Sequence, residues 1–143
     1  MNIYFSCSIT GGRADEDVYQ VLVEEMLRQG HEVLTAHLAH SNVVDTEQEV
    51  DAREIFLRDI GWLRTCDAVV AEVSTPSHGV GYEIAVGLAL EKPVLCCHRV
   101  GCRVSKIITG NDSKHLVVRE YENDEEARAC LNDFLLALKS ESV

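Results

Sequence analysis

Short apolar runs alternate with longer amphipathic segments along most of the chain. The runs are rich in β-branched residues and predict strands at residues 2–6, 31–35, 68–73, 93–98 and 116–121. Between them, apolar residues recur at helical spacing, which predicts helices at residues 15–29, 47–65, 80–92 and 124–138. Strands that alternate with helices favour right-handed βαβ crossovers, and therefore a mostly parallel sheet between two helix layers.

The simplest closure of these elements is one α/β domain over residues 1–143. We expect a flavodoxin-like (Rossmann-like) three-layer sandwich with five parallel strands in the order 2-1-3-4-5. Residues 36–46 show no clear period, and we expect a mobile loop over the site there. A small polar and basic segment is expected at residues 99–110.

Two polar loops follow the first and third predicted strands. Residues 8–13 and residues 74–79 both carry glycines and hydroxyl side chains. In a sheet of this order, ligands bind beyond the carboxyl ends of the strands, where the strand order reverses. That point lies between the first and third strands, so both loops are expected to border one site.

The second of these loops leads into a helix that carries Glu83 near its start. Unpaired N–H groups at a helix start, with the Ser77 hydroxyl beside them, could hold an anion. The helix dipole there is expected to lower the pKa of Glu83 and to favour its ionised form. Two plainer interpretations stay open, namely that Glu83 only compensates the dipole and that Ser77 only caps the helix.

The predicted helix over residues 47–65 carries a carboxylate on its apolar side. Ile55, Phe56, Trp62 and Leu63 mark that side, and Asp59 lies three or four residues from each of them. We expect the other charged residues of this helix, Arg58 among them, to face solvent. Apolar surroundings would raise the pKa of Asp59 and divide the two acids into a proton donor and a nucleophile. Alternatively, Asp59 caps a loop or pairs with an arginine.

Composition excludes several classes of function. The formal net charge of −11 argues against binding to a nucleic-acid polymer, because no basic face is available to replace phosphate counterions. No signal peptide or bilayer-length apolar run is present, so we expect no membrane association and a cytoplasmic protein, or a nuclear one in a eukaryote. The six cysteines form no CxxC pair and match no zinc spacing, which favours reduced, structural thiols and no metal site.

Three groups of residues, in order along the chain, resemble the 2′-deoxynucleoside 5′-monophosphate N-glycosidases, a family within the nucleoside 2-deoxyribosyltransferase superfamily. The first group is Tyr4, Phe5, Ser8, Ile9, Gly11, Gly12 and Arg13. The second is Asp59, Trp62, Leu63 and Asp67, followed by the apolar run to Val73. The third is Pro76, Ser77, Gly79, Val80, Gly81, Tyr82 and Glu83.

The resemblance implies a homodimer that needs no cofactor and cleaves the bond between base and deoxyribose in a nucleoside 5′-monophosphate. Glu83 would be the nucleophile, Asp59 the general acid and base, and Tyr4 would position the carboxylate and the sugar. The phosphate would be held by the loop residues of the first and third groups, namely Ser8, Ile9, Gly11, Gly12, Arg13, Ser77 and Gly79. Ser105 would reach the phosphate of the neighbouring subunit, or it could merely cap the short helix that follows it.

Two residues depart from the family pattern beside the substrate. Cys7 stands where we expect glycine in the animal members, and Thr10 where we expect arginine. The preferred base and part of the phosphate contacts therefore stay open. Three other activities also stay open: transfer of deoxyribose between bases, cleavage of ribonucleotides such as CMP, and nucleotide binding without catalysis.

Overall fold

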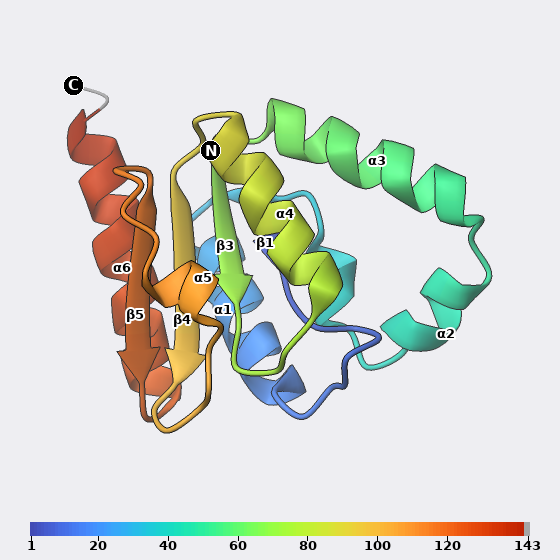
Figure 1. The fold of residues 1–143 in the computed structure, drawn as a ribbon, viewed down its shortest axis with the longest axis horizontal. Coiled ribbons are helices and arrows are strands. Elements are labelled where there is room, and N and C mark those ends of the chain that lie inside the picture. Colours follow the sequence, from blue (N-terminus) through green and yellow to red (C-terminus); the bar gives the residue numbers. More distant parts are fainter. Residues whose placement is uncertain (142–143) are drawn as a thin grey trace.

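A parallel β-sheet forms the centre of the protein, whose computed structural model describes residues 1–141 (Figure 1). Its strands are β1 (Asn2–Ser6), β2 (Glu32–Val33), β3 (Ala68–Glu72), β4 (Val94–Arg99) and β5 (Leu116–Tyr121). They pair in the order β2-β1-β3-β4-β5, and every pairing is parallel. The predicted α/β fold class and strand order are confirmed.

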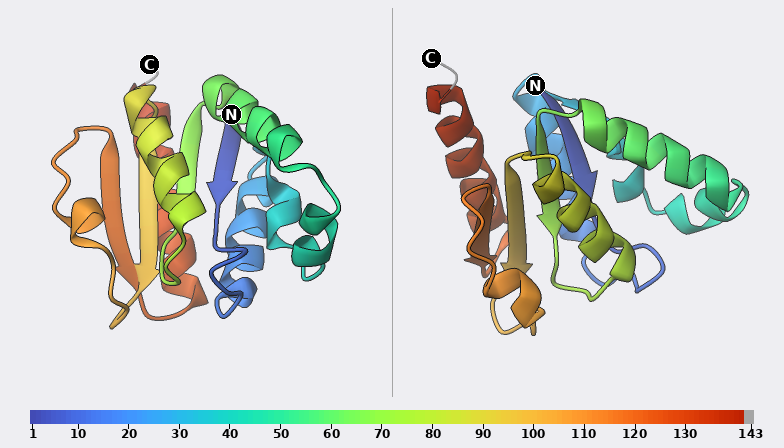
Figure 2. Two further views of the ribbon diagram at one scale, coloured as in Figure 1. Left: turned by 45° about the vertical axis from the view of Figure 1, so that its right-hand side comes forward. Right: turned by 45° about the horizontal axis from the view of Figure 1, so that its top comes forward.

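Helices cover both faces of this sheet (Figures 1 and 2). One face packs against α1 (Glu16–Arg28) and α6 (Asp124–Glu141), and the other against α3 (Ala52–Thr65) and α4 (His78–Ala89). Side chains of β3 alternate between the two cores, as strand geometry requires. Among residues 1–141, no helix has both the length and the apolar character needed to cross a bilayer.

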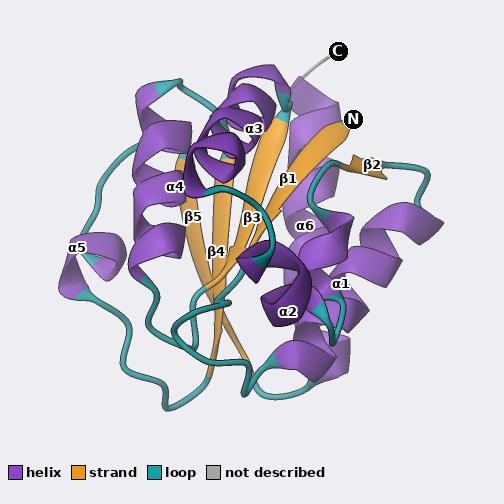
Figure 3. Cartoon of the chain, turned by 90° about the vertical axis from the view of Figure 1, so that its right-hand side faces the viewer, coloured by secondary structure: helices purple, strands orange, loops and turns teal. Residues whose placement is uncertain are grey.

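The segment between β2 and α3 is more regular than its sequence predicts (Figure 3). The segment expected to be a loop over the site, residues 36–46, does border the cavity described below, through Leu38 and Val44, but it is partly helical: a 3₁₀ turn, η1 (Ala36–Ala39), and the start of a short helix, α2 (Val43–Gln48), lie there. Leu38 and Val43 are buried in the core beneath α1, and Arg13 donates hydrogen bonds to the carbonyls of Leu38 and His40. These contacts join residues that are far apart in the sequence. The hydrophobic pattern of a short segment therefore does not predict them.

The predicted helix over residues 47–65 is in fact two helices. The chain turns between α2 and α3, and the carboxylate of Asp51 accepts a hydrogen bond from the N–H of Arg53 at 3.0 Å. This is the arrangement of a helix N-cap, so α3 begins anew at Ala52. The turn between the two helices lets α2 pack against η1.

A buried carboxylate, Glu72, lies at the end of β3 and fixes the loop that follows. It accepts hydrogen bonds from the N–H and the hydroxyl of Ser74, and from the hydroxyl of Tyr121 at 2.9 Å. The Ser74 oxygen in turn accepts a hydrogen bond from the N–H of Arg99 at 2.7 Å. Burial raises the pKa of Glu72 to about 7, although these hydrogen bonds act in the opposite direction. The loop after β3 is thereby tied to β4 and β5.

A second carboxylate, Asp15, ties the same loop to the one after β1. Asp15 stands at the N-cap position of α1, but its side chain makes no capping bond. It instead accepts hydrogen bonds from Thr75 at 2.9 Å and from the Arg99 guanidinium at 3.0 Å. The two loops that the sequence singles out are therefore held together by side chains of β4, β5 and the start of α1.

We predict that Tyr121→Phe destabilises the protein more at high pH than at low pH. The substitution removes a donor from Glu72, which is mostly ionised at pH 8 and mostly protonated at pH 5. The expected loss is about 2 kcal/mol at pH 8 and about 1 kcal/mol at pH 5, because hydrogen bonds to charged groups are the stronger ones. Denaturant unfolding at the two pH values measures both losses.

Tyr19→Phe is the matched control. Tyr19 is fully buried on the same side of the sheet, and its hydroxyl has no hydrogen-bond partner among residues 1–141. Its loss should cost little at either pH. Equal losses at pH 5 and pH 8 for Tyr121→Phe would show that Glu72 does not carry the pH dependence.

Candidate active site at the carboxyl end of the sheet

The loops after β1 and β3 touch each other beyond the carboxyl ends of those strands. A Cβ atom added at Gly11 would lie 2.3 Å from the carbonyl oxygen of Pro76 and 2.9 Å from Oγ of Ser8. No side chain fits at that distance from backbone, so the contact requires glycine. Gly12 has φ +124°, a conformation that L side chains rarely adopt.

A cavity of about 260 Å³ lies beside this contact and is bordered by the loop after β1, η1, α2, α3 and α4. Five of the residues predicted for the site line it, namely Ile9, Asp59, Ser77, Gly79 and Glu83. The two acids come from different helices and are far apart in the sequence, yet both face this one cavity. Cys7 and Thr10, which depart from the family pattern, line it as well.

Glu83 lies in the second turn of α4, where its side chain is half-buried and borders the cavity. Its Oε2 accepts a hydrogen bond from the hydroxyl of Ser6. Burial raises the pKa of Glu83 to about 7, and the charge of Asp59 adds to the rise, whereas Ser6 and Tyr4 oppose it. The expectation of a lowered pKa is therefore wrong. The helix begins one turn earlier, and the effect of its dipole is confined to that first turn.

Ser6 is not among the site residues predicted from the sequence, although a signal for it was present. Ser6 is the last residue of β1, and side chains two apart along a strand share a face. Tyr4, which had been singled out, therefore marks the face on which Ser6 also lies. Because the site lies beyond the carboxyl end of β1, a hydroxyl on the same face as Tyr4 at that end is a candidate site residue.

Tyr4 is fully buried on β1, two residues before Ser6. Burial, and then the charges of Glu83 and Asp59, raise the pKa of its phenol. Within residues 1–141, the hydroxyl has no hydrogen-bond partner of regular geometry. A buried polar atom without a partner costs free energy, so this hydroxyl calls for an explanation.

Asp59 faces the cavity from α3 and accepts a hydrogen bond from Nε of Arg58 at 2.8 Å. Burial raises the pKa of Asp59 even though Arg58 acts in the opposite direction, so the predicted rise is confirmed. The alternative of an arginine pair is also realised. Arg58 is not one of the solvent-facing charges that we expected, because it is largely enclosed.

Ser77 and Gly79 lie at the start of α4. Ser77 is the N-cap residue, and its Oγ accepts a hydrogen bond from the N–H of Val80 at 3.4 Å, as the capping interpretation predicts. Its side chain is half-buried and borders the cavity, so capping does not remove it from the site.

Ser8 and Arg13 lie behind the cavity rather than in its wall. The Ser8 side chain is fully buried, and its Oγ has no partner in the part of the chain that the structure describes. The guanidinium of Arg13 donates to the carbonyls of Ser8, Leu38 and His40, and stacks over the ring of Tyr19. Arg13 therefore connects the loop after β1 to η1.

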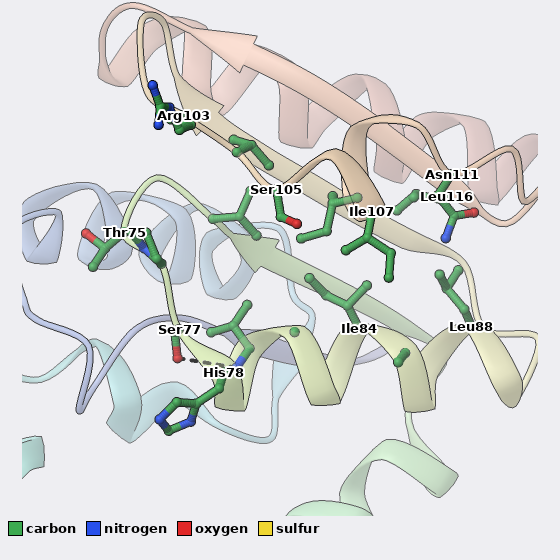
Figure 4. A pocket seen from close by; sticks show the side chains of 17 residues that line it. Thr75, Ser77, His78, Ile84, Leu88, Arg103, Ser105, Ile107, Asn111 and Leu116 are labelled. Atoms are coloured by element: carbon green, nitrogen blue, oxygen red, sulfur yellow. Dashed lines mark hydrogen bonds between the residues drawn. The ribbon is translucent and has the colours of Figure 1, made fainter.

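Ser105 borders a second cavity, of about 470 Å³, between α4 and the segment around α5 (Lys106–Thr109) (Figure 4). Figure 4 shows Ser105 across this space from Ser77 and His78. Ser105 is exposed and stands at the N-cap position of α5, but its side chain makes no capping bond. Ser105 lines this second cavity, whereas Glu83 lines the first.

The chain is similar in sequence to known proteins. The family model described as nucleoside 2-deoxyribosyltransferase matches residues 3–128. A protein of Danio rerio named 5-hydroxymethyl-dUMP N-hydrolase is 41% identical over 129 residues, which cover 87% of this chain and 90% of the relative. A protein of Methanosarcina mazei, provisionally named 2′-deoxynucleoside 5′-phosphate N-hydrolase 1, is 39% identical over 137 residues, 96% of this chain and 85% of the relative.

A solved structure shares the fold. The CMP N-glycosidase BcmB of Clostridium botulinum superimposes with a TM-score of 0.67 over 92% of this chain and 99% of that protein, at 15% sequence identity. The family model and the relatives each cover most of the chain. The chain belongs to the nucleoside 2-deoxyribosyltransferase family.

Proposed function

We propose that this protein hydrolyses the N-glycosidic bond of 2′-deoxynucleoside 5′-monophosphates and releases a free base and 2-deoxyribose 5-phosphate. The observation that carries the proposal is that Glu83 and Asp59 line one cavity, together with residues from the loop before α4. The names of the relatives from Danio rerio and Methanosarcina mazei point to the same class of reaction.

In the first step, ionised Glu83 attacks the anomeric carbon as the bond to the base breaks. The electrons of that bond leave with the base, and protonated Asp59 supplies a proton to it. The sugar passes through an oxocarbenium-like state and becomes an ester of Glu83, as in retaining glycosidases. Ser6 stabilises the charged form of Glu83 before the attack, because it donates a hydrogen bond to Oε2.

In the second step, water opens the ester. Asp59, now ionised, accepts a proton from the water as the oxygen attacks the anomeric carbon, and Glu83 departs as a carboxylate. Both acids thus return to their starting state. Neither of these two steps needs redox or metal chemistry.

The 5′-phosphate is proposed to bind where the two loops meet. Ile9, Ser77 and Gly79 line the cavity there, and the N–H groups at the start of α4 are suited to an anion. Ser8, Gly11, Gly12 and Arg13 shape the first loop from behind. The unpartnered hydroxyl of Ser8 would gain a partner if the loop adjusted around a phosphate.

Glu83→Gln tests the proposal most simply. The substitution removes the nucleophile but keeps the size of the side chain, so base release should fall at least about 1000-fold. Nucleotide binding should change little. Release of free base from a panel of deoxynucleoside monophosphates, including 5-hydroxymethyl-dUMP, is followed by chromatography, and binding by calorimetry.

Glu24→Gln is the matched control, since Glu24 is exposed on α1 and distant from the cavity. It should retain full activity. Substantial base release by Glu83→Gln would exclude Glu83 as the nucleophile.

The same panel separates the other activities. A new nucleoside formed when a second free base is added would indicate deoxyribosyl transfer. Faster cleavage of CMP than of dCMP would indicate a ribonucleotide N-glycosidase. Nucleotide binding without release of any base would indicate a non-catalytic binding module.

We also propose that the active form is a homodimer in which Ser105 of one subunit reaches the phosphate site of the other. Exposed apolar side chains on α3 and α4 support this, namely Phe56 (50% exposed), Leu57 (55%) and Tyr82 (54%). Phe56 and Tyr82 border a hollow that Asp59 and Glu83 also border, so a surface for association adjoins the acids. Phe56 had been assigned to the buried face of its helix, and its exposure is a correction.

A mixing experiment tests the shared site. Glu83→Gln and Ser105→Ala subunits should each be slow at low substrate concentration. After joint unfolding and refolding, half of the dimers are mixed, and each mixed dimer contains one complete site. Activity should therefore rise to about a quarter of the wild-type value. No rise above the sum of the two variants, or a monomer in sedimentation analysis, would contradict the shared site.

A further inference from the structure

Arg58 is enclosed by acidic and aromatic side chains although it lies on a surface helix. Its side chain is 24% exposed, and its guanidinium lies 4.9 Å from the centre of the Trp62 ring. Nε donates to Oδ1 of Asp59 at 2.8 Å, while Nη1 and Nη2 donate to the two carboxylate oxygens of Glu47 at 3.0 and 3.1 Å. One guanidinium thus connects two carboxylates that border the same cavity.

The partner of Arg58, Glu47, comes from a different segment of the chain. Glu47 lies on α2, and its Oε1 also meets Nε2 of His37, on η1, at 3.0 Å. Burial acts to raise the pKa of Glu47, but Arg58 and His37 outweigh it and the pKa is lowered. Glu47 is therefore ionised, and the forked pair with Arg58 holds α2 against α3.

The contact with Asp59 selects between its two oxygens. Oδ1 accepts from a donor that is charged at all relevant pH values, so a proton on Oδ1 would oppose Nε–H. Oδ2 makes no hydrogen bond among residues 1–141. A proton on Asp59 must therefore reside on Oδ2.

We propose that Arg58 is a positioning residue of the reaction: it fixes Asp59 so that Oδ2 carries the proton given to the departing base, and it holds Glu47 in the wall of the same cavity. The proposal rests on the proposed function and deepens it. The proton on Oδ2 passes to the base as the glycosidic bond breaks, and Oδ2 later accepts a proton from the attacking water. Arg58 itself neither gains nor loses a proton.

Arg58 also sets the charge balance of the two acids. The charged or titratable groups around Asp59 are Arg58 on its own helix, Glu47 on α2, His37 on η1, Glu83 on α4 and Tyr4 on β1. Arg58 lowers the pKa of Asp59 and that of Glu83, whereas Glu47 raises the pKa of Asp59. Substitutions of Arg58 and Glu47 should therefore move the pH profile in opposite directions.

The experiment measures kcat and kcat/KM for base release as a function of pH in Arg58→Gln, Arg58→Lys and Glu47→Gln. In Arg58→Gln, kcat should fall at least about tenfold because Asp59 loses its orientation. The acidic limb of the pH profile reports ionisation of Glu83, and the basic limb reports ionisation of Asp59. Both limbs should move to higher pH because a positive charge is lost, the Asp59 limb by about one unit. Arg58→Lys should restore the limbs, because the charge remains, but not kcat, because lysine lacks the planar fork.

Glu47→Gln should move the Asp59 limb of the pH profile to lower pH, because the negative charge of Glu47 raises the pKa of Asp59. The matched control is Arg53→Gln, which removes the same charge from an exposed position on the same helix. It should leave kcat and both limbs unchanged. Denaturant unfolding of each variant establishes that the fold is retained.

Three outcomes separate the explanations. Wild-type protein that releases no base from any nucleotide would overturn the proposed function, and the positioning role with it. If the wild-type protein is active and Arg58→Gln has the same kcat and the same pH profile, the positioning role alone would be overturned. If Arg58→Gln does not fold, a Glu47→Gln profile that stays in place or moves to higher pH would overturn it equally.

Discussion

Two carboxyl groups of like charge, Glu83 and Asp59, border one partly buried cavity, and the rest of the site follows from that constraint. Removing an ionised carboxylate from water is costly, and a second one nearby adds repulsion. Each acid accordingly accepts a hydrogen bond from a neighbouring side chain. Ser6 donates to Oε2 of Glu83 and Arg58 donates to Oδ1 of Asp59. Among residues 1–141, the second oxygen of each acid accepts no hydrogen bond of regular geometry, so it is left for chemistry.

The fold brings the acids together at the point where the strand order reverses. β1 supplies Tyr4 and Ser6, α4 follows β3 and supplies Glu83, and α3 precedes β3 and supplies Asp59. The loops at this edge are held from below by Glu72 and Asp15, through contacts that involve β4, β5 and α1. Residues far from the cavity thus determine where the start of α4 lies, and with it the position of Glu83.

Much of this could be predicted from the sequence, because the signals were local. The period of apolar residues predicted the strands and helices, and the simplest closure of their alternation predicted the strand order. The polar loops after the first and third strands indicated the edge where Glu83 and Asp59 meet. The pKa of Glu83 was predicted with the wrong sign, because a helix start can be recognised in a sequence and the degree of enclosure cannot. Arg58 was predicted to face solvent for the same reason. Its partner Glu47 lies on α2, and the sequence pattern did not show the turn that separates α2 from α3. A charged residue such as Glu72 inside an apolar strand was a usable signal that the sequence analysis did not use.

The coupling of the two acids is measured most directly by carbon-detected NMR of the side-chain carboxyl groups during a pH titration of the free protein. The account predicts that Glu83 titrates near pH 7, and that Asp59→Asn lowers this value because it removes a neighbouring negative charge. A Glu83 carboxyl that titrates near the ordinary value of 4.5, and does not respond to Asp59→Asn, would contradict it.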